Sequence, residues 1–252
     1  MTVLLLRLAG PLQAWGASAR FVRRTTESAP TKSGVIGLLA AAQGLDRAAD
    51  TGLARLAALR FGVRIDQPGT RVRDFQTAHH AVTGKSMPLS ERFYLADAVF
   101  TAALEGDPVL LSDLDEALRR PAHPLFLGRR SCPPAVPVEL GIRDTVLQQA
   151  LEDEPWQAAD WYQRLRRRDR TVPLSVLREP DPGAEEPRGD FQRDQPLSFA
   201  AEHRRHALRP VISTTVEVAN PRAVPARRPA TVGPGGSVPR HEPFDALEEE
   251  SL

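Results

Sequence analysis

A lysine, a serine and a glycine stand where an apolar helix is expected to begin. The order is Thr31-Lys32-Ser33-Gly34, and apolar residues at helical spacing continue through residues 33–44. The first turn of a helix leaves backbone N–H groups unpaired and carries partial positive charge, so this segment suits an anionic oxygen such as that of a phosphate. Thr31 and Ser33 are also common helix caps, which need no ligand. Phosphate binding and simple capping both remain open at this point.

Two other short features are suited to nucleic-acid chemistry. Arg129 and Arg130 follow a glycine, and Ser131 follows them, so two guanidinium groups and a hydroxyl can converge on phosphates. A solvated turn explains the same residues equally well. Trp15, beside Gly16, offers either a stacking face for a base or an apolar anchor for its loop, and burial is the usual state of an isolated tryptophan.

One group of residues is suited to acid–base cleavage of RNA. His79, His80, Lys85 and Tyr94 can in principle deprotonate a 2′-hydroxyl and protonate a leaving oxygen. Adjacent histidines in a polar loop are more often solvated or in contact with phosphate. The chain has no GxxxxGK[ST], GxSxG or HExxH motif, and its single Cys132 provides neither a disulfide framework nor a zinc-ligand pattern. We therefore expect no metal and no cofactor.

The charge of the chain is unevenly distributed. Residues 1–100 carry 13 Lys and Arg against 7 Asp and Glu, whereas the remainder carries 20 against 25, for a net charge of +1 over all 252 residues. The basic first part is the candidate nucleic-acid face. No segment has the pattern of a signal peptide or a membrane span, so we expect a cytoplasmic protein without membrane contact.

The elements that must position these residues follow from hydrophobic periodicity. Their order predicts the split βαβ pattern of ferredoxin-like and RNA-recognition folds, in the α+β class. The expected strands are residues 2–8, 59–65, 93–104 and 136–142, and the expected helices are 33–44, a run around 53–57, and 112–120. A polar insertion at 71–91 is expected to form a hairpin or loop between the second and third strands.

The pattern weakens after residue 143. We expect partial helix at 144–168, strands at 172–177 and 211–218, and a mobile, charged loop at 179–196. Residues 220–252 have the composition of a disordered tail. The resulting prediction is a palm domain at 1–143 with an insertion at 71–91, a smaller irregular extension at 144–219, and a tail at 220–252.

Several segments together resemble the Cas-five family, in particular its subunits of type I-E CRISPR Cascade. They are residues 6–16 (LRLAGPLQAWG), 30–39 (PTKSGVIGLL) and 127–133 (LGRRSCP). Residues 73–77 (RDFQT) match the family's Arg-Asp-Tyr-His-Thr stretch, with Phe75 and Gln76 as departures. The resemblance covers residues 2–142 well and the remainder poorly.

This resemblance implies a fold and a function. The fold would be a modified RNA-recognition (RAMP) palm with a β-hairpin thumb at 71–91. The function would be non-catalytic: capping the 5′ handle of the crRNA in an antiviral surveillance complex, beside the backbone subunit and the large subunit, with target DNA engaged only through the complex. The residues expected to contact RNA are Gln13, Trp15, Gly16, Arg23, Arg24, Lys32, Ser33, Gly34, Arg73, Lys85, Arg129, Arg130 and Ser131.

The resemblance also bears on cleavage. Type I-E complexes use a separate endoribonuclease, whereas the related type I-C subunit cuts RNA with a Tyr, Lys and His set. The type I-E motifs therefore favour binding without cleavage. A metal-independent endoribonuclease that uses His79 or His80 with Lys85 and Tyr94 stays open as the alternative.

Overall fold

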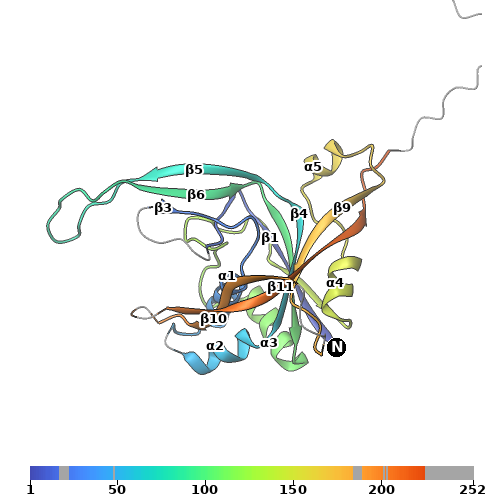
Figure 1. Cartoon of the computed structure of the whole chain (residues 1–252), viewed down its shortest axis with the longest axis horizontal. Coiled ribbons are helices and arrows are strands. Elements are labelled where there is room, and N and C mark those ends of the chain that lie inside the picture. Colours follow the sequence, from blue (N-terminus) through green and yellow to red (C-terminus); the bar gives the residue numbers. More distant parts are fainter. Residues whose placement is uncertain (17–22, 48, 184–188, 201, 203, 225–252) are drawn as a thin grey trace, which may run out of the picture.

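The computed structural model describes residues 1–16, 23–47, 49–183, 189–200, 202 and 204–224 (Figure 1). Its largest element is a seven-stranded antiparallel sheet in the order β10-β11-β9-β4-β7-β1-β8. The strands are β1 (Thr2–Ala9), β4 (Arg60–Gln67), β7 (Val99–Gly106), β8 (Glu139–Arg143), β9 (Thr171–Arg178), β10 (Asp190–Ser198) and β11 (Arg205–Ala219). The fold is thus mixed α/β with an antiparallel sheet.

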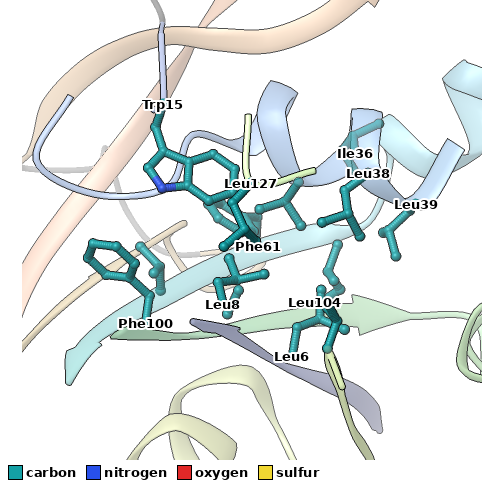
Figure 2. Packing of buried hydrophobic residues seen from close by; sticks show 14 of the residues in the cluster. Leu6, Leu8, Trp15, Ile36, Leu38, Leu39, Phe61, Phe100, Leu104 and Leu127 are labelled. Atoms are coloured by element: carbon teal, nitrogen blue, oxygen red, sulfur yellow. The ribbon is translucent and has the colours of Figure 1, made fainter. Parts of the chain in front are cut away.

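Helices cover both faces of this sheet, and the side chains of β1 show how. Leu4, Leu6 and Leu8 belong to one core cluster, with α1 (Lys32–Ala42), α2 (Asp50–Ala57) and α3 (Pro108–Arg119) (Figure 2). The alternating residues Val3 and Leu5 belong to a second cluster on the opposite face, with α4 (Leu147–Asp153) and the segment that leads into α5 (Asp160–Leu165). Because both faces are covered, β1 is an almost continuous apolar run.

A smaller sheet contains the polar insertion. It is formed by β2 (Leu12–Gln13), β3 (Arg23–Arg24), β5 (Thr70–Gln76) and β6 (Ser90–Ala96). Strands β5 and β6 pair antiparallel in continuous register, and their hairpin extends far from the main sheet (Figure 1). The predicted hairpin between the second and third strands is therefore confirmed.

The hairpin joins the main sheet through two short connections. Residues 68–69 link β4 to β5, and residues 97–98 link β6 to β7. Gly69 and Asp97 both have positive φ, 69° and 55°, and a Cβ on Gly69 would lie 2.4 Å from the carbonyl oxygen of Ala96. The predicted single strand at 93–104 is therefore wrong: Asp97 breaks it into two strands that belong to different sheets.

The helix expected at 112–120 begins four residues earlier. Asp107 is its N-cap, with the side chain accepting the N–H of Leu110 at 2.9 Å, and Pro108 occupies the first turn. An Asp-Pro pair is a strong helix start, because proline fixes φ and needs no hydrogen bond there. The prediction had placed the cap at Ser112 instead.

The chain after residue 143 is more regular than the sequence suggested. Strand β9 pairs with β4, so the predicted irregular extension at 144–219 continues the main sheet. The predicted mobile loop at 179–196 contains the first part of β10, which packs against α1 and α2, while residues 184–188 lie outside the described part. Strand β11 is 15 residues long; its first half pairs with β10 and its second half with β9.

The start of the predicted tail is also ordered. Asn220 is buried, and its side-chain amide donates to the carbonyl oxygens of Gln163 and Arg166 at 3.2 and 2.9 Å. The boundary at residue 220 is therefore wrong for 220–224. Residues 225–252 lie outside the described residues.

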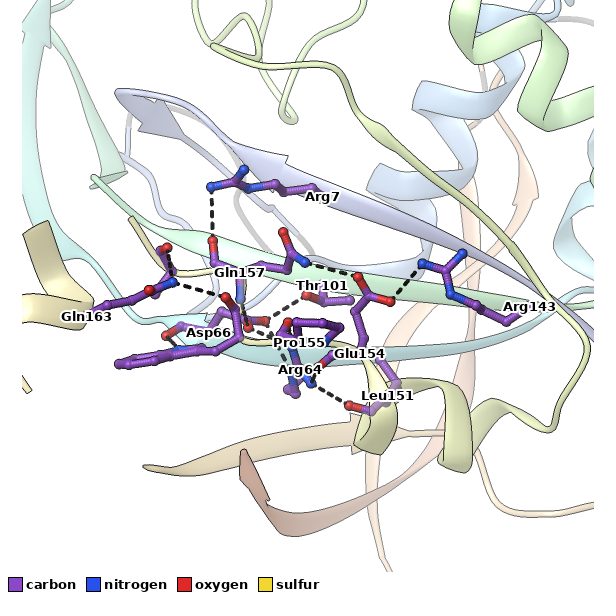
Figure 3. A network of polar contacts seen from close by, with 12 residues as sticks. Arg7, Arg64, Asp66, Thr101, Arg143, Leu151, Glu154, Pro155, Gln157 and Gln163 are labelled. Carbon is purple, nitrogen blue, oxygen red and sulfur yellow. Dashed lines mark hydrogen bonds and ion pairs between the residues drawn. The ribbon is translucent and has the colours of Figure 1, made fainter. Parts of the chain in front are cut away.

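A buried polar network fixes the segment between α4 and α5 to the sheet (Figure 3). Arg64 on β4 is fully buried, forms an ion pair with Asp66 at 2.8 Å, and donates to the carbonyl oxygens of Leu151, Glu154 and Pro155. A guanidinium group is costly to bury unless its donors are satisfied. Here they hold the α4–α5 connection in one position.

Candidate nucleic-acid binding site

Segments that are far apart in the sequence line one cavity of about 930 Å³. They are the loop after β2, the start of α1, the loop after α3, and the connection between β10 and β11. The volume lies within the range of small-ligand pockets, roughly 300–1,000 Å³. Of the residues expected to contact RNA, five line this cavity: Trp15, Gly16, Ser33, Gly34 and Arg130.

Gly128 brings two of these segments together. Its φ is 87°, and a Cβ at this position would lie 1.8 Å from the carbonyl oxygen of Ala14. Backbone hydrogen bonds fix the approach: the N–H of Ala14 donates to Leu127 at 3.1 Å, and that of Leu127 donates to Cys132 at 2.7 Å. Only glycine allows this contact, so the Gly-Arg-Arg-Ser turn is held against the loop at Trp15.

Trp15 is an anchor rather than a free stacking face. Its side chain is fully buried among apolar residues (Figure 2), and its Nε1 donates to Gln13 Oε1 at 3.0 Å. Gln13 is also fully buried, and its amide donates to the carbonyl oxygens of Leu8 and Ala98. A Cβ on Gly34 would lie 2.8 Å from the indole, so the helix start packs directly on this ring. The amide donors of Gln13 are thus used within the protein, and Trp15 forms part of the cavity wall.

Several backbone N–H groups at the N-terminus of α1 already have partners within the protein. Thr31 is the N-cap and accepts the N–H of Gly34 at 3.3 Å, and the N–H of Lys32 donates to Asp194 Oδ2 at 2.8 Å. The ammonium of Lys32 lies 2.9 Å from Glu179 in a side chain only 3% exposed. Burial lowers the pKa of Lys32, and the carboxylate of Glu179 opposes this effect. Lys32 is thus paired within the protein and does not line the cavity.

The two adjacent arginines have different environments. Arg129 donates to the carbonyl oxygens of Phe93, Arg24 and Thr25, and its guanidinium lies 4.8 Å from the centre of the Tyr94 ring. Its donors are therefore used to hold the base of the hairpin. Arg130 is exposed and lines the cavity, whereas Ser131 is exposed and is not among the lining residues.

The remaining predicted contacts lie outside the cavity, on the smaller sheet and its β5–β6 hairpin. Arg23 and Arg73 both approach the carboxylate of Glu91, at 3.9 and 3.5 Å, and both guanidinium groups are more than half exposed. Arg24 is exposed on β3, and Lys85 is exposed near the hairpin tip. The exposed residues of the predicted site thus fall into two groups: one lines the cavity, and the other consists of basic side chains on the smaller sheet and its hairpin.

The alternative catalytic residues are not assembled into one site. His80 Nδ1 accepts the N–H groups of Val82 and Thr83, at 3.3 and 3.2 Å, within the exposed hairpin tip. Tyr94 is only 3% exposed and lies on β6, four residues from the start of that strand at Ser90. Four extended residues span about 13 Å. Tyr94 is therefore separated from the histidines at the tip.

The cavity also contains residues that the sequence did not single out. Arg47, Arg204 and His123 line it, as does His206, whose ring centre lies 6.3 Å from that of Phe199. Burial lowers the pKa of His206, the charge of Arg204 lowers it further, and Asp194 opposes both effects. Among the described residues that line the cavity, Asp46 is the only acidic one, whereas three are arginines. No local motif marks these residues, because folding of β10 and β11 over α1 brings several of them together.

Neither a metal-binding cluster nor a membrane-spanning helix is found in the described part of the chain. No group of three or more His, Cys, Asp or Glu side chains there is arranged to hold a metal ion. No described helix has the length and apolar character needed to cross a membrane.

Comparison with known proteins places the chain in a family. The model of a family of CRISPR-associated proteins (Cas_Cas5) matches residues 3–212. The chain belongs to the Cas5 family. Among curated relatives, the CRISPR system Cascade subunit CasD of Escherichia coli (strain K12) is 36% identical over 156 residues, which cover 55% of this chain and 70% of that protein.

Solved structures resemble this Cas5 chain over most of its length. One, described as a crystal structure of a Cas protein, has a TM-score of 0.66 and 36% identity, and the match covers 88% of this chain and 97% of that one. A second, from a CRISPR RNA-guided surveillance complex, has a TM-score of 0.71 and 31% identity, with coverage of 90% and 95%. The mixed α/β fold is thus shared with Cas proteins.

Proposed function

We propose that this Cas5 chain is a non-catalytic RNA-binding subunit of a type I-E CRISPR surveillance complex that caps the 5′ handle of the crRNA. The observation that carries the proposal is the convergence of Gly16, Ser33, Gly34 and Arg130 on one cavity. The similarity to the Cascade subunit CasD and to a chain of an RNA-guided complex supports the assignment to a surveillance complex. Handle capping rests on the cavity itself.

The cavity has the chemistry that a single-stranded RNA end needs. Arg130, Arg47 and Arg204 supply forked donors for phosphate oxygens, and the hydroxyl of Ser33 adds a further donor. Gly16 is exposed, and a Cβ placed on it would meet no atom within 4 Å, so its backbone is open to a ligand. Unstacked bases of single strands are commonly held on such protein surfaces. An extruded handle base would pack in the cavity while arginines hold the adjoining phosphates.

We assign the central strands to a RAMP palm and the hairpin to a thumb. The order β4-β7-β1-β8, with α1 after β1 and α3 after β7, agrees with a split βαβ arrangement. The β5–β6 hairpin lies between the second and third strands of this unit. In this proposal Arg73 and Lys85 contact the RNA backbone from the thumb, and Arg23 contacts it from the adjoining strand β3.

The proposal includes partners and a compartment. The chain would contact the backbone subunit and the large subunit of the complex in the cytoplasm. Target DNA would be recognised by base pairing with the guide, while this subunit holds the geometry of the handle.

Copurification of the assembled complex tests handle capping. We expect Arg130→Ala combined with Arg47→Ala to lower the crRNA content per complex, whereas Arg55→Ala, an exposed arginine outside the cavity, should leave it unchanged. Affinity for handle RNA should fall as the salt concentration rises. The logarithm of the association constant plotted against the logarithm of the salt concentration should have a slope of about −3 if about four phosphates are neutralised. Equal retention of guides with and without the handle would contradict capping.

A cleavage assay tests the non-catalytic part of the proposal. The isolated chain is incubated with repeat RNA in EDTA, and we expect no discrete product. A discrete product that disappears on substitution of His79 and His80 by Ala would instead establish a metal-independent endoribonuclease.

A further inference from the structure

An exposed aromatic and arginine-rich surface lies on α5, away from the cavity. Trp161 is 56% exposed and Leu165 is 73% exposed, and their i, i+4 spacing places them on the same side of the helix. The segment leading into α5 packs in the core cluster on the opposite face of the main sheet from α1 (Figure 1). This surface is therefore separate from the proposed handle site.

The exposed tryptophan is held by other aromatic side chains. The Trp161 and Tyr162 ring centres are 5.6 Å apart with perpendicular planes, and Tyr162 lies 6.0 Å from Trp156 in a second edge contact. Trp156 is buried, and its Nε1 donates to the carbonyl oxygen of Asp66 at 2.9 Å. Trp161 is thus attached to the polar network of Figure 3. Its orientation is set before any ligand arrives, which lowers the entropy cost of binding.

The turn after α5 is held equally firmly. The side chain of Asn220 donates to the carbonyl oxygens of Gln163 and Arg166. The backbone N–H of Val224 donates to the carbonyl oxygen of Arg167 at 2.9 Å. The residues that follow β11 therefore fix the backbone from which the arginines project.

The charges on this surface are only partly compensated. Arg164 and Arg222 both pair with Asp160, and Arg166 pairs with Asp169 at 2.7 Å. Among the described residues, no ion pair or hydrogen bond involves the guanidinium of any of the three remaining arginines, Arg167, Arg168 and Arg170. A cation near a helix C-terminus is favoured by the helix dipole, but this effect acts within the last turn and does not require three further arginines.

We propose that this surface, formed by Trp161, Leu165, Arg164, Arg167, Arg168 and Arg170, binds single-stranded nucleic acid. A base would stack on Trp161, and the unpaired guanidinium groups would follow the adjacent phosphates. Stacking on an aromatic ring combined with closely spaced arginines is the chemistry of sequence-tolerant single-strand binding. Uncompensated cations at nearly successive positions match a chain of phosphates better than a protein surface, whose carboxylates are irregularly spaced.

Tryptophan fluorescence of the full-length chain reports directly on this surface. Trp15 and Trp156 are 0% and 4% exposed, so the difference between the wild type and Trp161→Phe isolates the signal of Trp161. We expect oligo(dT) or oligo(rU) to quench this difference signal, and the two oligonucleotides show whether DNA or RNA is preferred. Replacing Arg167, Arg168 and Arg170 by Ala should weaken binding about tenfold and reduce the salt slope by about 2.

Matched variants separate this proposal from the handle proposal. Combined Arg55→Ala, Arg119→Ala and Arg120→Ala removes the same charge from exposed positions on and beside α2 and α3, and it should leave the quenching unchanged. Arg130→Ala should weaken handle binding while the Trp161 signal persists.

Three results would overturn the inference. They are an absence of Trp161-dependent quenching with both oligonucleotides, equal effects of the two triple substitutions, and a Trp161 response to poly-glutamate but to neither oligonucleotide. The last result would indicate an acidic protein partner instead.

Discussion

The carboxylate of Asp194 accepts the backbone N–H of Lys32, 2.8 Å away at the first residue of α1. The two residues are 162 positions apart in the sequence. The same carboxylate accepts two hydrogen bonds from Arg209, at 2.9 and 2.8 Å. The helix N-terminus that was expected to hold a phosphate therefore holds a carboxylate from β10, and this contact fixes β10 over α1.

We expect Asp194→Asn to destabilise the protein by about 3 kcal/mol, because it leaves the buried charge of Arg209 with weaker compensation. Urea unfolding followed by circular dichroism measures this difference. Asp190→Asn is the control, since Asp190 is exposed on the same strand. Equal stability of the two variants would show that the contact between Asp194 and α1 contributes nothing.

Arg129 and Arg130 should separate stability from binding. Arg129→Ala removes donors to three carbonyl oxygens, so we expect a loss of about 2 kcal/mol in the free energy of unfolding. Arg130→Ala should change stability by less than about 0.5 kcal/mol, because its side chain is exposed. In titrations with handle RNA, Arg130→Ala should weaken affinity about tenfold. Unchanged affinity would remove Arg130 from the site.

Gly128→Ala should be far more damaging than Gly84→Ala. Both glycines have positive φ, 87° and 66°, but a Cβ on Gly128 would meet the backbone of Ala14, whereas one on Gly84 would meet no atom within 4 Å. We expect losses of more than about 3 kcal/mol and about 1 kcal/mol respectively. Thermal unfolding of the two variants provides the comparison. Similar losses would mean that backbone strain alone matters.

His206 should make the protein less stable in mild acid. The folded protein holds the pKa of His206 below its ordinary value of 6.5, so the unfolded chain binds the proton first as the pH falls. Stability associated with neutral His206 is thus retained above pH 6.5 and is lost as the pH drops from there toward the lower folded pKa. Urea unfolding of wild type and His206→Gln between pH 8 and 5 should show the wild type losing more stability. Parallel pH profiles would contradict this assignment.

Local patterns predicted the central strands and helices well. The apolar run at Thr2–Ala9 became β1, and the alternation that begins at residue 59 became β4, because burial of alternate or continuous apolar residues is encoded nearby in the sequence. Strand β10 was missed because its polar residues and Pro196 resemble a loop. Its stability comes from pairing with β11 and from contacts with α1 and α2, which no local pattern reveals.

The candidate site was predicted in part for a similar reason. Short sequence motifs identified Gly16, Ser33, Gly34 and Arg130, and these four residues line one cavity. The pairing of Lys32 with Glu179 could not be predicted, because Glu179 lies 147 residues away in the sequence. Residue type indicates what a side chain can bind, but only the fold determines whether its charge is already satisfied.

The base of the β5–β6 hairpin is linked to the wall of the cavity. The N–H of Asp97 donates to the carbonyl oxygen of Pro11 at 3.1 Å, and the side-chain amide of Gln67 donates to the backbone carbonyl oxygen of Asp97. Gly69 leaves no space for a side chain. Hydrogen bonds and close backbone packing thus hold the base of the hairpin against the main sheet. Arg129 donates to the carbonyl oxygen of Phe93 on the hairpin, and its neighbour in the sequence, Arg130, lines the cavity. The base of the hairpin and the wall of the cavity are therefore connected through two adjacent residues of one turn.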